Sequence, residues 1–262
     1  MAYQEEMLEV RGTKIQLLKG GRGDPLLYLH SAGGEVLWLP FFEALSQHFT
    51  VYLPAHPGFS KSEGLEKIDT MEDLVFHTTD LIDQLGLEKP FVAGLSLGGW
   101  LAAELATRYA QRIRKLVLMN AVGLRVEGAP VADIFAATPE ETRRLVFYDP
   151  ESELARMFVP DTPPPEVLEM VLKAREATAR IGWNPYLHNP KLRERLYRIT
   201  VPTLIIWGDS DRLVPVEHGR AYQQGIAGSQ LVLLEKCGHA PPFEKPEETA
   251  RVIVDFFSGR VD

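Results

Sequence analysis

Short apolar runs alternate with longer amphipathic stretches over most of the chain. Residues 26–29 are a continuous apolar run, which is typical of a strand buried on both faces. Comparable runs, each predicted to be a strand, lie at 50–53, 91–94, 113–119, 203–207 and 230–234. Stretches with helical patterning lie at 38–48, 70–85, 100–110, 217–225 and 246–257. This alternation predicts the α/β class, with a mostly parallel central sheet and helices on both faces.

Local signals mark the ends of some of these elements. Leu8–Val10 and Ile15–Leu18 flank Gly12, which predicts an opening pair of strands joined by a turn. Thr70 is followed three residues later by Asp73, a loose form of the capping box that begins many helices. The sequence therefore predicts both a first turn and the start of one helix.

The alternation stops after Ala121. Residues 122–198 show helical patterns and no convincing strand, and we expect helices at 138–147, 152–158 and 165–179. The strand pattern then returns at 203–207. We therefore predict an α/β core formed by residues 1–121 and 199–262, interrupted by a helical lid at 122–198.

Composition and charge narrow the class of partner. Of the 262 residues, 45% are hydrophobic and 24% are charged, as in ordinary globular proteins. The formal net charge is −8 and Lys and Arg form no block, so we expect no nucleic-acid partner. No apolar stretch reaches the roughly 18 residues that span a bilayer, so we expect no membrane partner. The oligomeric state stays open, with a homodimer as one possibility.

The sequence also bears on location and cofactors. Cys237 is the only cysteine, which excludes an intrachain disulfide. The first ten residues contain no basic segment followed by an apolar run, so we expect no signal peptide and a cytoplasmic location. No dinucleotide-binding glycine pattern follows a strand, and no group of His, Cys, Asp and Glu has metal-ligand spacing. We therefore expect no cofactor and no metal.

The segment Gly94–Gly98 has the pattern Gly-x-Ser-x-Gly, with Ser96 at its centre. An apolar strand precedes it and an Ala-rich helix follows it, the setting in which a nucleophilic serine lies on a tight, strained turn. Ser96 is therefore the candidate nucleophile. The alternative is that Ser96 only caps the helix in a fold without activity.

A nucleophilic serine needs a base and an acid that orients it. His239 and Asp211 each follow a predicted strand, at the edge where open α/β sheets place their sites. We predict that His239 takes the proton of Ser96 and that Asp211 holds the tautomer of His239. Asp209, two residues before Asp211, is the rival for the acid.

Five blocks of the sequence together resemble the α/β-hydrolase superfamily, in matching order and spacing. They are His30–Gly34, Pro57–Ser62, Gly94–Gly99, Trp207–Asp211 and Gly238–His239. The resemblance covers nearly the whole chain apart from the lid, and it favours Asp211 over Asp209. It implies an oxyanion hole formed by the N–H groups of Ala32 and Leu97. Ser31 departs from the family, which usually has glycine there.

The resemblance also bears on the substrate pocket. His30 would support the oxyanion loop and border the pocket. Most aromatic side chains of the lid would pack the lid on the core, and we expect Trp183 and Tyr186 to face the space above Ser96. Such a wall would suit an apolar substrate.

The function predicted from these features is hydrolysis of a small, apolar carboxylic ester through an acyl-enzyme on Ser96. The same triad also suits relatives that cleave carbon–carbon bonds of ring-fission products, hydrolyse lactones or thioesters, or transfer acyl groups. Ring-fission hydrolases often carry Trp directly after the catalytic His, where this chain has Ala240. A third hypothesis, a binding protein on the same fold, is disfavoured by the complete triad.

Overall fold

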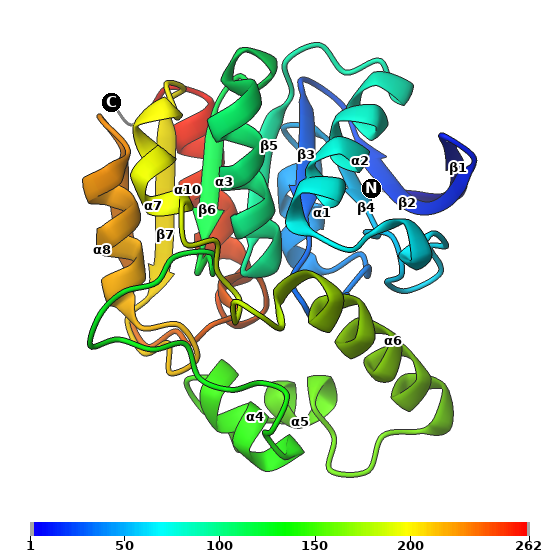
Figure 1. The fold of residues 1–262 in the computed structure, drawn as a ribbon, viewed down its shortest axis with the longest axis vertical. Coiled ribbons are helices and arrows are strands. Elements are labelled where there is room, and N and C mark those ends of the chain that lie inside the picture. The colour runs from blue at the N-terminus through cyan, green and yellow to red at the C-terminus, as the bar shows by residue number, and fades with distance from the viewer. Residues whose placement is uncertain (1–2, 261–262) are drawn as a thin grey trace.

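The computed structural model describes residues 3–260; positions 1–2 and 261–262 of the predicted core lie outside this range. Eight strands form one sheet in the order β1-β2-β4-β3-β5-β6-β7-β8. Their bounds are β1 Tyr3–Val10, β2 Thr13–Gly21, β3 Pro25–Leu29, β4 Thr50–Pro54, β5 Phe91–Leu95, β6 Leu116–Met119, β7 Thr203–Gly208 and β8 Gln230–Leu234. β2 pairs antiparallel with β1 and β4, and every pair from β4 to β8 is parallel (Figure 1). The predicted fold class is confirmed.

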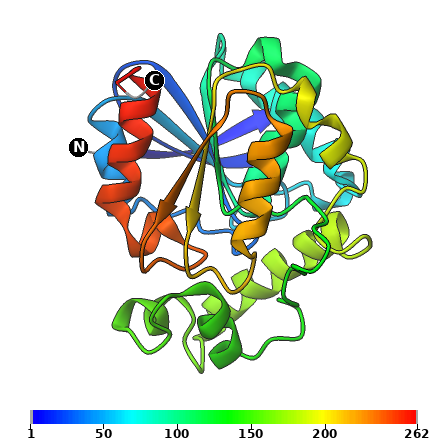
Figure 2. The ribbon, with the colours of Figure 1, turned by 90° about the vertical axis from the view of Figure 1, so that its left-hand side faces the viewer.

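Two layers of helices cover the two faces of the sheet (Figure 2). Leu26 and Tyr28 of β3 pack with residues of α1 (Pro40–Ser46) and α10 (Pro246–Phe257). Leu27 and Leu29, which point the other way, pack with residues on the side of α2 (Met71–Gln84), α3 (Leu97–Tyr109) and α8 (Val216–Gly225). Because neighbouring side chains of a strand point to opposite faces, a continuous apolar run is buried on both sides.

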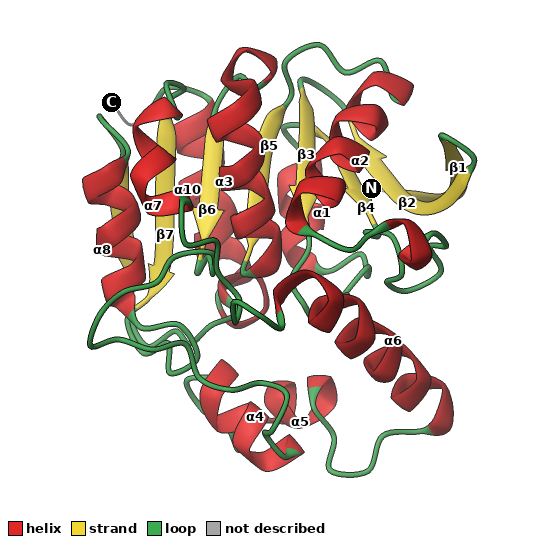
Figure 3. Cartoon of the chain, in the orientation of Figure 1, coloured by secondary structure: helices red, strands yellow, loops and turns green. Residues whose placement is uncertain are grey.

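Three of the helices between β6 and β7 lie beyond the carboxyl ends of the parallel strands (Figures 1 and 3). They are α4 Pro139–Val146, α5 Glu153–Phe158 and α6 Pro165–Gly182. Among the described residues of the segment 122–198, β-type pairing is limited to an isolated bridge between Gly123 and His188. The position of these helices is compatible with a lid over the sheet edge, and the exact boundaries of the lid stay a prediction.

The shorter helical segments connect or follow the larger elements. They are η1 Leu65–Lys67, η2 Ala110–Arg112, α7 Leu192–Arg195, η3 Leu196–Arg198 and α9 Pro241–Glu244. The expected capping box is present, because Thr70 Oγ1 accepts from Asp73 N and Asp73 accepts from Thr70 N. The prediction of a strand from residue 113 was wrong at its start, since Ile113 N still donates to Ala110 O in the turn that closes η2 and β6 begins only at Leu116.

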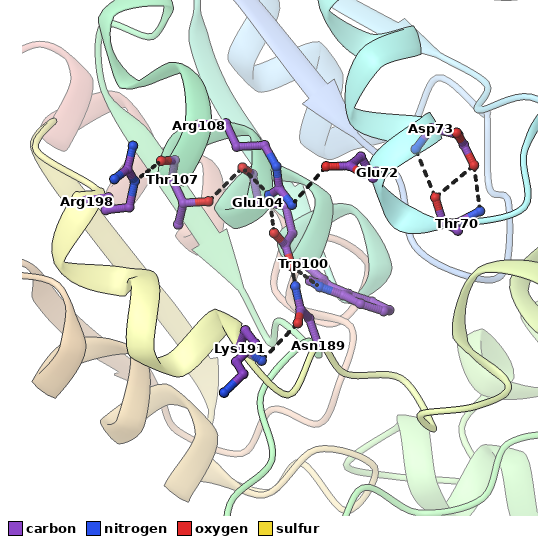
Figure 4. A network of polar contacts seen from close by, with 10 residues as sticks. All are labelled: Thr70, Glu72, Asp73, Trp100, Glu104, Thr107, Arg108, Asn189, Lys191 and Arg198. Atoms are coloured by element: carbon purple, nitrogen blue, oxygen red, sulfur yellow. Dashed lines mark hydrogen bonds and ion pairs between the residues drawn. The ribbon is translucent and has the colours of Figure 1, made fainter.

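A buried carboxylate ties α3 to the segment that returns from α6 to the core (Figure 4). Glu104 has only 1% of its surface exposed. Its Oε1 accepts from Trp100 Nε1 at 3.1 Å and from Asn189 Nδ2 at 2.7 Å, and its Oε2 pairs with Arg108. A buried charge is stable only when its partners are in place, so this network fixes the return segment on α3.

Replacing Glu104 with alanine should lower the free energy of unfolding by about 3–5 kcal/mol. The reason is that the Arg108 guanidinium, the Trp100 indole N–H and the Asn189 amide would each lose Glu104 as a partner. Denaturant unfolding checks this value. The matched control is Glu72→Ala, since the Glu72 side chain is 59% exposed and also pairs with Arg108. That variant should lose less than about 1 kcal/mol. Equal losses in the two variants would contradict the role of the buried network.

Candidate active site

Ser96 lies at the sharp turn between β5 and α3. Its backbone has φ 54° and ψ −111°, a conformation that costs a residue with a side chain about 1–3 kcal/mol. The Ser96 N–H donates to Met119 O at 2.9 Å, and the Ser96 carbonyl accepts from Trp100 N at 3.0 Å. Ser96 occupies the N-cap position of α3, yet its side chain makes no capping hydrogen bond. The hydroxyl does not serve to cap the helix, which removes that alternative interpretation.

The two glycines of the motif are required by close backbone contacts. A Cβ atom on Gly94 would lie 2.2 Å from the carbonyl oxygen of Gly98, and one on Gly98 would lie 2.0 Å from that of Leu29. Real Cβ atoms do not approach backbone oxygens so closely. The strand and the helix can therefore meet at this angle only with glycine on both sides of the Ser96 turn.

The strand register brings the loops of the site to one edge. Leu95 pairs with Met119, and Met119 pairs with Ile206, so β5, β6 and β7 end nearly level. Gly208 pairs with Leu234, which aligns the end of β8 with that of β7. The loops that follow these four strands carry Ser96, Asn120, Asp211 and His239.

Asp211 is fully enclosed, with none of its side chain exposed. Its Oδ1 accepts from the backbone N–H groups of Leu213 at 2.8 Å and Val214 at 2.9 Å. Its Oδ2 accepts from His239 Nδ1 at 2.8 Å and from Asn120 Nδ2 at 2.7 Å. Four donors around one carboxylate fix its orientation. Because Oδ2 accepts from Nδ1–H, the Nε2 atom of a neutral His239 is left as a proton acceptor.

The side of His239 that faces away from Asp211 carries an unused nitrogen. Nε2 is buried and has no hydrogen-bond partner among residues 3–260, Ser96 included. The backbone of the His239 loop is fixed, because His239 N donates to Val146 O at 2.6 Å, next to the end of α4. Hydrogen bonds of catalytic groups often form only with substrate bound, so this geometry is compatible with a base that acts on Ser96.

Asn120 is a residue of the site that sequence reasoning did not place in the hydrogen-bond network. It directly follows β6, has φ 43°, and donates both to Asp211 and, at 3.4 Å, to the carbonyl oxygen of Gly238. Asn120 thus joins the acid loop to the His239 loop, one residue after the Met119 carbonyl that holds Ser96. The feature of the sequence that could have indicated Asn120 is a polar residue directly after a buried strand.

Asp209, the alternative candidate for the acid, makes no hydrogen bond with His239 within residues 3–260. Asp209 Oδ1 accepts from Ser210 Oγ at 2.8 Å and from Cys237 N at 3.5 Å, as expected of a turn residue. Cys237 itself is buried, and burial raises the pKa of its thiol well above its usual value. Its thiol is therefore poorly suited to act as a second nucleophile.

The loop after β3 contains the predicted oxyanion donor Ala32. His30 is buried, accepts from His56 N with Nε2 at 2.9 Å, and donates from Nδ1 to Ser31 O at 2.7 Å. Burial lowers the pKa of His30 to about 4, which keeps the ring neutral at pH 7. His30 thus supports the loop through both nitrogens.

The second predicted oxyanion donor is Leu97. It is the first residue of α3, where the N–H has no acceptor within the helix.

A sequence model of the alpha/beta hydrolase family matches residues 23–252. The chain belongs to the alpha/beta hydrolase family. The prediction of this fold and superfamily is therefore confirmed.

Among curated relatives, this alpha/beta hydrolase is 28% identical to the 2-hydroxy-6-oxo-6-phenylhexa-2,4-dienoate hydrolase of Comamonas testosteroni, over 94% of this chain and 92% of that one. The structure of a meta-cleavage product hydrolase from Pseudomonas fluorescens IP01 is similar with a TM-score of 0.79 and 25% identity, over 98% of both chains. The naproxen esterase of Bacillus subtilis shares the fold with a TM-score of 0.78 and 18% identity, over 98% of this chain and 92% of that one. The expected hydrolase is supported; a carboxylic ester as its substrate is not confirmed.

The two lid residues expected near the substrate lie apart from the triad contacts. Trp183 is 63% exposed, and its ring packs on Phe135 at 5.2 Å between centroids. The Tyr186 hydroxyl donates to Ala132 O at 2.7 Å and accepts from Ile134 N at 2.9 Å. Tyr186 therefore holds the lid backbone in this alpha/beta hydrolase, and a role for either residue in the pocket stays a prediction.

Residues 3–260 of this alpha/beta hydrolase contain neither a metal-ligand cluster nor a membrane-spanning helix. Within that range no three His, Cys, Asp or Glu side chains are grouped so that they could hold a metal ion. No helix in the same range is long and apolar enough to cross a membrane.

Proposed function

We propose that the chain hydrolyses a carbon–carbon bond next to a ketone in a 2-hydroxy-6-oxohexa-2,4-dienoate, with Ser96 as nucleophile. The observation that carries the proposal is the similarity, over nearly the whole chain, to hydrolases named for such dienoates. The enclosed Asp211–His239 pair and the strained Ser96 turn supply the machinery that such a hydrolysis needs. This reaction replaces ester hydrolysis as the main functional hypothesis.

The chemistry of the named substrate determines the bond. A 2-hydroxy-6-oxohexa-2,4-dienoate contains an enol, a ketone, a conjugated diene and a carboxylate, but no ester. Hydrolysis can therefore only break a carbon–carbon bond at the ketone. The C5–C6 bond is the suitable one once the 2-hydroxydienoate has passed to its 2-keto tautomer, in which the 2-hydroxyl has lost its proton and C5 has gained one. The electron pair of the broken bond is then delocalised through C4 and C3 onto the C2 oxygen.

In the first half of the reaction, His239 Nε2 accepts the proton of the Ser96 hydroxyl as the oxygen attacks the C6 ketone. The N–H groups of Ala32 and Leu97 would stabilise the oxyanion that forms. Asp211 stabilises the imidazolium through Nδ1. The C5–C6 bond of the 2-keto tautomer then breaks and its electron pair moves through C4 and C3 to the C2 oxygen. That oxygen takes up the proton from His239, and the acyl group stays on Ser96.

In the second half, water supplies the missing atoms. His239 Nε2 accepts a proton from a water molecule, whose oxygen attacks the acyl carbon on Ser96. The bond between the acyl carbon and Ser96 Oγ breaks, and the hydroxyl regains the proton from His239. The products are a carboxylic acid from the C6 side and a dienoate from the C5 side, which together account for one molecule of water.

Hydrolysis of a carboxylic ester is the second candidate, and the residue after His239 favours it. Ring-fission hydrolases often have Trp there, whereas this chain has Ala240, which is 3% exposed and packs in a small cluster with Phe147 and Ala155. The following Pro241 begins α9. An ester would use the same steps, except that the electron pair leaves on the alcohol oxygen.

A substrate panel separates the two candidates. We expect kcat/KM for 2-hydroxy-6-oxo-6-phenylhexa-2,4-dienoate, followed by loss of its absorbance, to exceed that for p-nitrophenyl acetate and octanoate by about 100-fold or more. The opposite order would overturn the carbon–carbon assignment and favour the ester. Turnover of neither class would contradict both candidates.

A further inference from the structure

We propose that Ser31 and Glu35 form a positioning pair that fixes the oxyanion loop around Ala32. The inference rests on the proposed function, because it assumes that the Ala32 N–H binds the oxyanion. It concerns a position where this chain departs from the family, which usually has glycine at residue 31. A glycine has no hydroxyl and could not make the side-chain hydrogen bonds of Ser31.

The Ser31 side chain closes the loop on both sides of Ala32. Ser31 Oγ accepts from Gly33 N at 3.1 Å and donates to Glu35 Oε2 at 2.7 Å. The Ser31 carbonyl accepts from Gly34 N at 3.1 Å. A hydroxyl that accepts from the backbone two residues later is a recurrent way to stabilise a turn. Ala32 lies inside this turn, so the direction of its N–H is set by the turn.

Glu35 lies against the loop backbone instead of extending into solvent. A Cβ atom on Gly33 would lie 1.8 Å from Glu35 Oε1, so the carboxylate covers the space beside the Gly33 backbone. Burial raises the pKa of the Glu35 carboxyl, while the Ser31 hydrogen bond and the nearby charge of His239 act in the opposite direction. Desolvating a carboxyl group is costly, and the Ser31 hydroxyl offsets part of that cost.

Helix α6 also contacts this loop. Thr178 Oγ1 of α6 donates to Ala32 O at 3.4 Å, and Ala174 Cβ would lie 3.6 Å from a Cβ on Gly34. Together with His30 Nδ1, which donates to Ser31 O, these contacts leave Ala32 little freedom. The Ser31–Glu35 hydrogen bond is the contact between two side chains that restrains this loop. Its loss should let the Ala32 N–H turn away from the oxyanion.

The test compares Ser31→Ala, Glu35→Ala, Glu35→Gln and the double variant Ser31→Ala/Glu35→Ala, using the better substrate of the panel. We expect kcat to fall about 10- to 100-fold in Ser31→Ala and Glu35→Ala, with KM within about threefold. Glu35→Gln should keep most of the activity, because the amide oxygen still accepts from Ser31. The double variant should be no slower than the slower single variant, since both remove one hydrogen bond. The control is Glu63→Gln, whose side chain is 62% exposed.

A second readout does not depend on the substrate. The rate of covalent labelling of Ser96 by a fluorophosphonate should fall in Ser31→Ala and Glu35→Ala and stay unchanged in Glu63→Gln, with melting temperatures recorded for all variants. Normal turnover and labelling in Ser31→Ala and Glu35→Ala, or equal losses in Glu35→Ala and Glu35→Gln, would overturn the positioning pair while leaving the proposed function intact. A parent protein that neither labels nor turns over either substrate would overturn both.

Discussion

Replacing Ser96 with alanine will lower kcat by about 10⁴-fold or more, while KM for the same substrate changes by less than about threefold. Alanine removes the oxygen that attacks the carbonyl carbon, and no neighbouring group can replace it. The Ser96 side chain makes no capping hydrogen bond with α3, so its loss should not unfold the protein. Steady-state kinetics with the better substrate of the panel, alongside thermal unfolding of the variant, check this result.

The matched control for that variant is Ser210→Ala. Ser210 lies in the neighbouring acid loop and uses its hydroxyl only to donate to Asp209 and not to the triad. Its kcat should stay within about twofold of the parent protein. A Ser96→Ala protein that retained full activity would exclude an acyl-enzyme on residue 96.

Replacing Asp211 with asparagine will lower kcat by about 10⁴-fold, because it selects the wrong tautomer of His239. The N–H groups of Leu213 and Val214 both point at Oδ1 and require an acceptor there. The asparagine oxygen will therefore face them, and its NH₂ group will face His239. Nδ1 then becomes an acceptor, Nε2 carries the proton, and the ring can no longer take a proton from Ser96. Kinetics across pH 6–9 will measure the loss.

The control for this variant is Asp209→Asn, which tests the rival acid directly. Asp209 accepts from Ser210 and Cys237 and does not contact His239, so its amide variant should lose less than about threefold in kcat. A large loss in Asp209→Asn together with a small loss in Asp211→Asn would reverse the assignment of the acid.

The main elements of the fold follow from local sequence signals. Continuous apolar runs predicted β3 to β8, and the runs of β3 to β7 have no polar side because these strands are covered on both faces. Thr70 with Asp73 marked the start of α2. The limits of elements were less predictable. β1 extends back to Tyr3 although nearly all of its residues are exposed, since its pairing with β2, not burial, holds it.

In the candidate site, too, some residues could be predicted from the sequence and others could not. Ser96 and Asp211 each follow a buried strand and His239 follows the edge strand β8, and the order of the parallel strands brings these positions together. The contacts of Asn120 with Asp211 and of Ser31 with Glu35 depend on the path of loops, which no periodicity encodes. Trp183 and Tyr186 were chosen for their aromatic character alone, and lid packing decides where such residues point.

The central claim is that Ser96 is a nucleophile activated by His239. The most direct measurement is mass spectrometry of the protein after reaction with a fluorophosphonate, with peptide mapping of the adduct and a parallel sample of His239→Ala. We expect one adduct, located on Ser96, whose formation is slowed at least about 100-fold in His239→Ala. An unlabelled Ser96, or labelling at the same rate without the imidazole, would contradict it.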